Sequence, residues 1–363
     1  MTPTKKTLRV VRQASSALQL DEGETAHVGV DVHKTTYHVA LHSTTRGVVT
    51  TWVQPARPQA LIDRLMPIGK RIAQVVYEAG PTGFGLARRL GAANLPVQVI
   101  APSHLLAPVG AEAKSDRLDC RKLAMHSAKG LLRPVRVPTE QEEADRQVLR
   151  LREQMVRKAR TTQQQIKSFL LQHGVAEPAG LAHWTKQAVE ALRGLALLPE
   201  LRFALDVLLD ELDHVKQQVK RVTDRLGELA EARRHAKAVD EMRTVPGVGP
   251  VTAMSFRLEL PEPERFKRAG QVAKMLGLAP QVRQSGQTRR EGGLLKSSSG
   301  RLRTVLVEAA WRWVGGDEAA EGHYRRLVAN TGSSKKAIVG MARRLGVLLW
   351  RLSVHGQPYR VAS

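Results

Sequence analysis

The sequence contains little cysteine, few aromatic residues and no long apolar run. Cys120 is the single cysteine among 363 residues, which excludes an intrachain disulfide framework and a cysteine zinc cluster and is typical of a reducing compartment. Aromatic residues make up 4% of the chain, so a core has to be built from Leu, Val, Ala and Ile. No stretch of about 18 apolar residues is present to cross a membrane, and residues 4–19 lack the compact apolar segment of a signal peptide. We therefore expect a soluble, cytoplasmic protein.

Acidic residues are also scarce relative to basic ones. The chain has 57 Lys and Arg against 34 Asp and Glu, which gives a formal net charge of +23. This surplus predicts a polyanionic partner, most simply nucleic acid, although a ribosome-like or membrane-surface protein would share it. The length predicts two or three domains at roughly 150 residues each.

The first part of the chain predicts an arm followed by an α/β domain. Residues 1–25 are polar and basic without a clear period, and we interpret them as a flexible basic arm. Over residues 26–138, three short strands in succession predict an antiparallel meander, and later strands separated by helices predict a mixed sheet. The expected strands are His27–Val32, Tyr37–His42, Gly47–Val53, Arg71–Glu78 and Val97–Ile100.

Strand signals disappear over residues 139–240, where the pattern becomes helical. From Leu201 to Leu229, apolar residues recur at strictly alternating spacings of four and three, the heptad pattern of a coiled coil. This pattern favours a coiled coil between two copies of the chain. The alternative is one long helix that packs inside its own domain.

Residues 241–363 predict a smaller helical domain. It begins with a Gly- and Pro-rich turn at Thr244–Ala253 and contains a polar loop at Gln281–Ser299. Residues 281–304 hold six basic residues against one acid, Glu291, which predicts contact with nucleic acid. The six are Arg283, Arg289, Arg290, Lys296, Arg301 and Arg303.

Four acidic residues of the α/β region are placed where a metal site could form. Asp31 interrupts an apolar strand, where an unpaired carboxylate is costly to bury, and His33 shares its face of that strand. Glu78 ends a later strand, and Asp116 and Asp119 are three apart on a predicted helix. Converging carboxylates repel one another unless cations neutralise them. Hard divalent ions such as Mg²⁺ or Mn²⁺ suit such oxygen ligands, and a pair of them about 4 Å apart can promote phosphodiester cleavage.

Six short segments between residues 27 and 303 carry a family resemblance. They are His27–Lys34 (HVGVDVHK), Tyr77–Gly85 (YEAGPTGFG), Ala113–Ala124 (AKSDRLDCRKLA), Val245–Ala253 (VPGVGPVTA), Leu276–Gly286 (LGLAPQVRQSG) and Gly292–Arg303. In this order they resemble the DEDD-type transposases of bacterial insertion sequences. That family includes the pilin-gene-inverting recombinases and the bridge-RNA-guided serine recombinases.

The resemblance implies an architecture and a metal site. It implies a RuvC-like domain of ribonuclease H fold over residues 26–138, a helical coiled-coil region over 139–240 and a serine-bearing transposase domain over 241–363. It also implies that Asp31, Glu78, Asp116 and Asp119 are the metal-binding DEDD tetrad.

The Ser285-Gly286 step matches the place where the family carries its nucleophilic serine. A serine hydroxyl can attack a phosphodiester and hold one DNA end covalently, and arginines can clamp the phosphate. The sequence departs from the family at residues 296–301, which are KSSSGR instead of a Lys–Gly–Asn-like run. Ser297, Ser298 and Ser299 are therefore alternative nucleophiles.

The resemblance implies a recombinase that cuts and rejoins donor and target DNA under the direction of a guide (bridge) RNA. It also implies a nucleoid-associated homo-oligomer, dimeric through the coiled coil and tetrameric when assembled. Two other functions fit the residues. A RuvC-like structure-specific endonuclease would use the tetrad to hydrolyse DNA without a covalent intermediate, and a catalytically inert nucleic-acid-binding scaffold would need neither tetrad nor serine.

Overall fold

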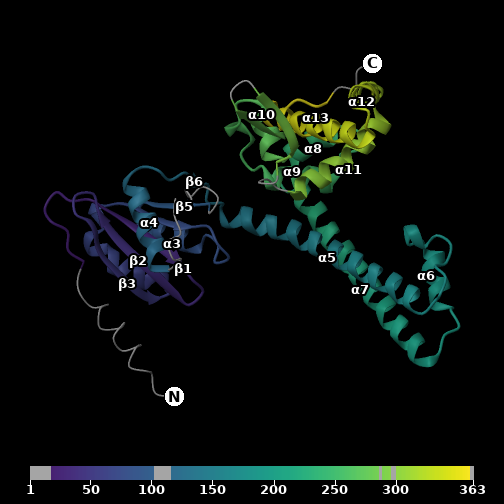
Figure 1. Cartoon of the computed structure of the whole chain (residues 1–363), viewed down its shortest axis with the longest axis horizontal. Coiled ribbons are helices and arrows are strands. Elements are labelled where there is room, and N and C mark those ends of the chain that lie inside the picture. The colour runs from purple at the N-terminus through teal and green to yellow at the C-terminus, as the bar shows by residue number, and fades with distance from the viewer. Residues whose placement is uncertain (1–17, 102–115, 286–287, 296–299, 360–363) are drawn as a thin grey trace. The chain divides into compact units, whose positions relative to one another are not determined.

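The structure is a computed structural model of the whole chain, and it describes residues 18–101, 116–285, 288–295 and 300–359. The chain forms two compact units, Met1–Thr139 and Glu140–Ser363 (Figure 1). The helical middle and the C-terminal region, expected as two domains, thus belong to one unit. No helix in the described ranges is both long and apolar enough to cross a membrane.

The first unit contains a six-stranded mixed sheet in the order β3-β2-β1-β4-β5-β6. Strands β1, β2 and β3 form an antiparallel meander, β4 and β5 run parallel to β1, and β6 is antiparallel to β5. This order and these directions are those of the ribonuclease H fold, so the expected fold class is confirmed. The strands are β1 (Ala26–Val32), β2 (Thr36–Ser43), β3 (Gly47–Pro55), β4 (Ile72–Glu78), β5 (Val97–Ile100) and β6 (Pro134–Val135).

Helices cover both faces of this sheet. Helix α2 (Pro58–Leu65) starts with a proline in its first turn and buries Leu61, Ile62 and Leu65. It continues into a 3₁₀ helix, η2 (Met66–Arg71), and with α3 (Gly85–Ala92) it encloses the main apolar core. Helix α4 (Asp116–Ala128) covers the other face, where Cys120 and Ala124 pack on the strands.

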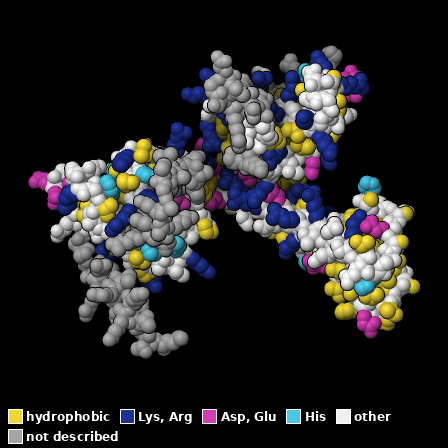
Figure 2. All heavy atoms as spheres, viewed as in Figure 1, with side chains coloured by type: hydrophobic (Ala, Val, Ile, Leu, Met, Phe, Trp, Pro, Cys, Tyr) yellow, Lys and Arg dark blue, Asp and Glu magenta, His cyan; other side chains and the backbone are white. Residues whose placement is uncertain are grey.

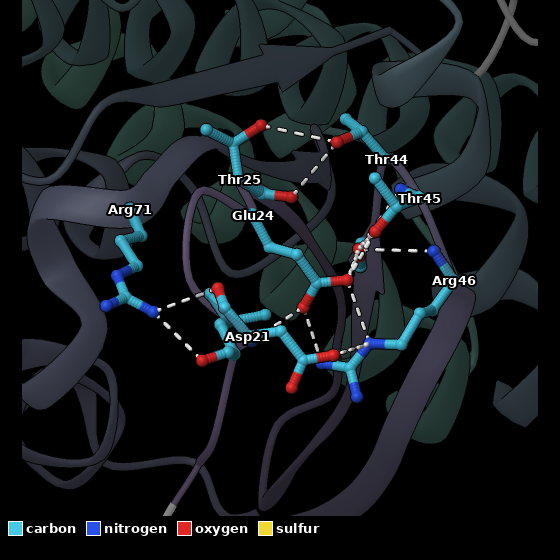
Figure 3. A network of polar contacts seen from close by, with 9 residues as sticks. Asp21, Glu24, Thr25, Thr44, Thr45, Arg46 and Arg71 are labelled. Atoms are coloured by element: carbon cyan, nitrogen blue, oxygen red, sulfur yellow. Dashed lines mark hydrogen bonds and ion pairs between the residues drawn. The ribbon is translucent and has the colours of Figure 1, made fainter.

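Residues 18–25, expected as the end of a flexible arm, are fastened to the sheet. Leu18 is buried in the core, and Glu24 accepts hydrogen bonds from Ser43, Thr45 and Arg46 at the β2–β3 turn (Figure 3). The Arg46 guanidinium and then the Thr45 hydroxyl hold the pKa of Glu24 well below its usual range. Glu24 therefore stays ionised and ties the segment before β1 to the turn.

The second unit begins with a long hairpin of two helices, α5 (Glu140–Gln172) and α7 (Pro199–Glu231), which run side by side in opposite directions (Figure 1). The apolar residues that recur at heptad spacing from Leu201 to Leu229 form one stripe along α7, and none of them is exposed. Near the free end, Leu205 and Leu212 pack with Ile166 of α5 and with α6 (Lys186–Arg193), beside a 3₁₀ turn, η4 (Leu181–His183). The stripe is thus covered within one chain, and the coiled coil between copies that its spacing favoured is not confirmed.

The base of the hairpin joins the C-terminal core. Leu149 of α5 and Leu226 and Leu229 of α7 share one apolar cluster with the C-terminal helices. Those elements are α8 (Ala236–Arg243), α9 (Pro250–Glu259), η5 (Pro263–Arg265), α10 (Ala269–Met275), α11 (Gly300–Gly316), α12 (Glu318–Thr331) and α13 (Ser334–His355). Because they share this core, the helical hairpin and the C-terminal helices form one compact unit, with no boundary near residue 240.

A buried ionic cluster connects the start of α5 to the segment after α7. Asp145 of α5 is 3% exposed and accepts two hydrogen bonds from Arg234, each at 2.8 Å, and one from His235 at 2.9 Å. Burial alone would raise the pKa of Asp145, but hydrogen bonds from Arg234, His235 and Gln141 outweigh it and hold that pKa well below its usual range. The start of α5 is therefore fixed to the segment that follows α7.

One part of the C-terminal region differs from the sequence-based expectation, and the structure explains a glycine in another. The polar loop expected at 281–299 contains a hairpin of β7 (Pro280–Ser285) and β8 (Thr288–Leu294). The turn at Thr244–Ala253 holds Gly247 at φ +82°, and a Cβ there would lie 2.6 Å from Cβ of Arg312. Close packing on α11 thus accounts for this glycine.

Candidate active site

Asp31 lies near the carboxyl end of β1 and contacts a histidine. Its Oδ2 atom is 3.0 Å from Nε2 of His33, and the Asp31 side chain is 24% exposed. The His33 backbone N–H donates to the Thr36 carbonyl at 3.0 Å in the turn to β2. The pairing of His33 with Asp31 agrees with their expected position on one face.

A glycine allows α4 to approach the face of β1 that carries Asp31. Gly29 and Asp31 are two residues apart and so lie on the same face. A Cβ on Gly29 would lie 2.0 Å from the Cys120 carbonyl oxygen and 2.7 Å from the Ala124 nitrogen. Burial raises the pKa of the Cys120 thiol to about 11, and the Asp31 charge adds to the rise. The Cys120 turn of α4 therefore lies beside Asp31, and the Cys120 thiol is buried there.

Glu78 occupies the matching position on the next strand. Strands β1 and β4 are parallel, and Val30 is opposite Tyr77 in their register. Both of these residues belong to the core under α2 and α3. The next residue on each strand, Asp31 and Glu78, therefore lies on the α4 face at the carboxyl end of its strand.

Helix α4, which packs on this face, carries the remaining two predicted acids. Asp119 immediately precedes Cys120, and Asp116 is the first residue of α4, although its side chain lies outside the described part of the structure. Among the side chains that the structure describes, no three His, Cys, Asp or Glu residues form a group that could hold a metal ion. The fold thus brings the ends of β1 and β4 and the Cys120 turn of α4 to one face of the sheet, and the described side chains form no closed metal site there.

A cavity of 790 Å³ opens beside Asp31. Its walls include His33 and Lys34 after β1, Thr82 in the loop after β4, and Arg89 of α3. Two basic side chains next to a carboxylate can hold a phosphate while the acid takes part in chemistry. Lys34 and Arg89 were not among the predicted site residues, because a lysine after a strand and an arginine on a helix surface give no signal of their own.

Comparison with known proteins identifies the family. The model described as "Transposase IS116/IS110/IS902 family" matches residues 239–325, and a transposase model of the DEDD type, DEDD_Tnp_IS110, matches residues 28–175. The Sinorhizobium fredii protein y4qE, named as a transposase, is 33% identical over 295 residues, which is 79% of this chain and 72% of that protein. The chain belongs to the IS116/IS110/IS902 family of transposases.

Other relatives of this transposase carry matching names. The transposase for insertion sequence element IS1111A of Coxiella burnetii is 22% identical over 93% of this chain and 92% of its own length. The transposase for insertion sequence element IS1533 of Leptospira borgpetersenii is 25% identical over 92% of this chain and 97% of its own length. A solved structure of T. thermophilus RuvC in complex with Holliday junction substrate covers 31% of this chain and 99% of that chain, at 15% identity and a TM-score of 0.22.

Membership of this family makes the chain a DNA-cutting enzyme with DNA as its partner. The DEDD domain also indicates a divalent metal ion. The residues present fit such an ion in their chemistry, because carboxylate oxygens are the ligands that hard divalent cations prefer.

The hairpin of the second unit carries the predicted nucleophile of the transposase. Ser285 is the last residue of β7 and is paired with Thr288, while Arg283 is paired with Arg290 and Gln284 with Arg289. The backbone register thus gathers Ser285, Arg283, Arg289 and Arg290 at the turn end of one hairpin. The side chains of residues 282–291, and all of Lys296, Ser297, Ser298 and Ser299, lie outside the described part.

The last two predicted nucleic-acid contacts, Arg301 and Arg303, make contacts inside the protein. Arg301 pairs with Glu153 of α5 at 3.1 Å, and Arg303 donates to the Gly277 carbonyl at 3.3 Å. Both are on α11, and both hold it to neighbouring elements. Their role in packing was not visible in the sequence, where they belong to one basic cluster with the hairpin arginines.

Proposed function

We propose that this transposase is the recombinase of an insertion sequence, which cuts and rejoins donor and target DNA through a covalent serine–DNA intermediate. The proposal is supported by the position of Asp31 and Glu78 at the carboxyl ends of two adjacent parallel strands, on the face against which the Cys120 turn of α4 packs. Lys34 and Arg89 line a cavity beside Asp31. This edge offers acids for metal binding and cations for the phosphate.

The metal-binding residues in this proposal are Asp31, Glu78, Asp116 and Asp119. A Mg²⁺ or Mn²⁺ ion bound there would neutralise charge that builds up on the phosphate oxygens. The chain's own residues position the site: His33 orients the Asp31 carboxylate, and Gly29 lets α4 carry its acids up to β1.

The serine step balances without an outside reactant. The Ser285 hydroxyl loses its proton as its oxygen bonds to the DNA phosphorus, and the bond from phosphorus to one deoxyribose oxygen breaks while that oxygen takes up a proton. The phosphodiester is thereby exchanged for a serine–DNA diester. The hydroxyl of the new strand reverses the step and frees the serine, and the hairpin arginines would hold the phosphate meanwhile.

The proposed guide is an RNA that pairs with both DNA partners. The support is the resemblance together with the net charge of +23, which suits a large polyanion. Sequencing the RNA that co-purifies with the protein expressed from its native locus tests this. A discrete RNA with segments complementary to donor and target is the expected result, and a broad sample of cellular RNA would contradict it.

We propose that the enzyme acts as a homo-oligomer, and that the contact is at the free end of the α5–α7 hairpin and not along its buried stripe. Phe203 and Val207 lie one turn apart on α7 and are 71% and 52% exposed, and Leu198 just before α7 is 70% exposed. Hydrophobic side chains gather at this end in Figure 2. Large exposed apolar groups of this kind mark association sites.

Light scattering should show that Phe203→Asp lowers the oligomer mass, and a wild-type monomer at micromolar concentration would contradict the proposal.

The metal and serine roles are tested separately. Asp31→Asn and Asp119→Asn should abolish divalent-ion-dependent recombination, while Asp63→Asn, on the surface of α2, should not.

Ser285→Ala should eliminate the covalent DNA adduct, whereas Ser298→Ala should retain it. An adduct mapped to Ser297, Ser298 or Ser299 would reassign the nucleophile. Cleavage without any adduct would favour the hydrolytic endonuclease.

A further inference from the structure

A pocket between the last two helices of the chain lies apart from every residue in the proposed chemistry. It has a volume of 560 Å³, which is within the range of small-ligand sites. Helix α13 supplies Arg343, Arg344 and Arg351, helix α12 supplies His323, and Tyr359 comes from the segment after α13. The floor between these polar groups is apolar and includes Ala320, Leu327, Val347 and Leu348.

The three arginines are available to an external anion. Arg343 and Arg351 are two helical turns apart, Arg344 is seven residues before Arg351, and all three are exposed. Within the described part of the chain, none of them forms an ion pair or a hydrogen bond. Some exposed basic residues elsewhere in the unit do have partners, such as Lys220 with Asp224, Arg225 with Glu228 and Arg325 with Glu321, each at 2.6 Å.

One acid near the pocket, Asp317, offsets only part of the charge of the three arginines. Asp317 is buried, and its carboxylate caps α12 at the Ala320 N–H and accepts from the Tyr359 hydroxyl at 2.7 Å. Burial lowers the pKa of His323, and the positive charges of Arg344 and Arg326 lower it further against the opposing effect of Asp317. The pocket is therefore electropositive.

One wall of the pocket is aromatic and fixed in place. The Tyr359 ring meets the Trp313 ring edge-on at 6.3 Å, and its backbone N–H donates to the Thr244 hydroxyl at 2.8 Å. A ring held at both its hydroxyl and its backbone gives a rigid surface, and flat bases stack on such surfaces whatever their sequence.

We propose that this pocket binds an unpaired nucleotide of a nucleic-acid strand, with its phosphates on Arg343, Arg344 and Arg351 and its base against Tyr359 and the apolar floor. Guanidinium groups match phosphate oxygens in geometry and charge. A base inside a duplex cannot enter a pocket, so the ligand is single-stranded or has a base turned out. The inference rests on the proposed function only for the kind of partner, since none of the proposed catalytic residues lines the pocket.

The test measures binding directly, by fluorescence anisotropy of labelled 12-nucleotide single strands of DNA and RNA and of the matching duplex, at several salt concentrations. The variant Arg343→Gln/Arg344→Gln/Arg351→Gln should weaken single-strand binding about 10- to 100-fold. Its slope of log affinity against log salt should fall by about 2, because each single-strand phosphate contact contributes about 0.7. The arms with DNA and RNA show which strand the pocket prefers.

The matched control removes three positive charges from paired residues: Lys220→Gln/Arg225→Gln/Arg325→Gln should change affinity less than the pocket variant does, by no more than about 2-fold. Tyr359→Leu should weaken single-strand binding with an unchanged salt slope, and Tyr359→Phe should restore it because the ring is kept. Equal losses in the pocket and control variants, or equal losses for duplex and single strand, would overturn the proposal. A polyglutamate peptide tests whether the pocket takes an acidic protein segment instead. If polyglutamate displaces the strand from the wild type but not from the pocket variant, the proposal is overturned. Ser285→Ala should bind the single strand like the wild type. The binding test therefore stays valid even if the proposed serine chemistry is wrong.

Discussion

Replacing Gly29 by Ala should move α4 away from β1 and disable the proposed metal site. The added Cβ would lie 2.0 Å from the Cys120 carbonyl oxygen and 2.7 Å from the Ala124 nitrogen. Both are backbone atoms, which no side-chain rotation can move aside. Helix α4 would have to retreat by about 1 Å or more to reach a normal contact, and Asp119 would retreat with it.

The size of both effects follows from this displacement. Overpacking of a core typically costs 1–3 kcal/mol, and a clash with backbone belongs at the upper end, so we expect a loss of about 3 kcal/mol and a fall in melting temperature of roughly 10 °C. Misplaced metal ligands typically cost about 10- to 100-fold in affinity. Calorimetry measures the first effect, and electron paramagnetic resonance of free Mn²⁺ measures the second without any DNA substrate.

The control for this variant is Gly91→Ala in α3, where a Cβ would meet nothing within 4 Å. It should leave Mn²⁺ affinity unchanged and stabilise α3 slightly, by up to about 1 kcal/mol. Wild-type Mn²⁺ affinity in Gly29→Ala would refute the reasoning that α4 carries metal ligands to β1. Equal losses in both glycine variants would show that the effect is not specific to this contact.

Three further predictions concern the buried groups. Asp145→Asn should lower stability at pH 7 by about 3 kcal/mol, measured by urea unfolding, because it leaves Arg234 without its buried carboxylate. The pKa of Asp145 is held below its usual value of about 3.9, so this contribution to stability is present above pH about 4 and is lost as the pH falls further. If the stability difference between wild type and Asp145→Asn were as large at pH 2 as at pH 7, the low pKa of Asp145 would be contradicted. The Cys120 thiol, with a pKa of about 11, should react with iodoacetamide at pH 8 at least about 100-fold more slowly in the folded than in the unfolded protein, and equal rates by mass spectrometry would show that it is not buried. Leu212→Asp should destabilise the helical hairpin by about 3–5 kcal/mol, seen as loss of circular dichroism on mild heating, whereas an unchanged melting curve would mean that the stripe is not packed inside the chain.

The sequence alone determined most of the local elements of the first unit and marked the acids of the candidate site. A short apolar run at His27–Val32 and β-prone segments at Tyr37–His42 and Gly47–Val53 predicted β1, β2 and β3. The runs before Glu78 and at Val97–Ile100 predicted β4 and β5. A carboxylate inside an apolar strand marked Asp31, because its burial is costly without a function. These features depend on neighbours in the chain, so periodicity and residue type were sufficient to find them.

The tertiary structure decided what each surface contacts. The heptad spacing of α7 is the same whether its partner is another chain or α5, and only the fold shows that α5 covers it. The hairpin at 280–294 has few apolar residues to mark its strands, so the sequence there predicts a loop. Arg301 and Arg343 look alike in sequence, yet one is paired with Glu153 and the other lines the pocket. Partners distant in the chain are chosen by packing, and no local pattern of residues encodes that choice.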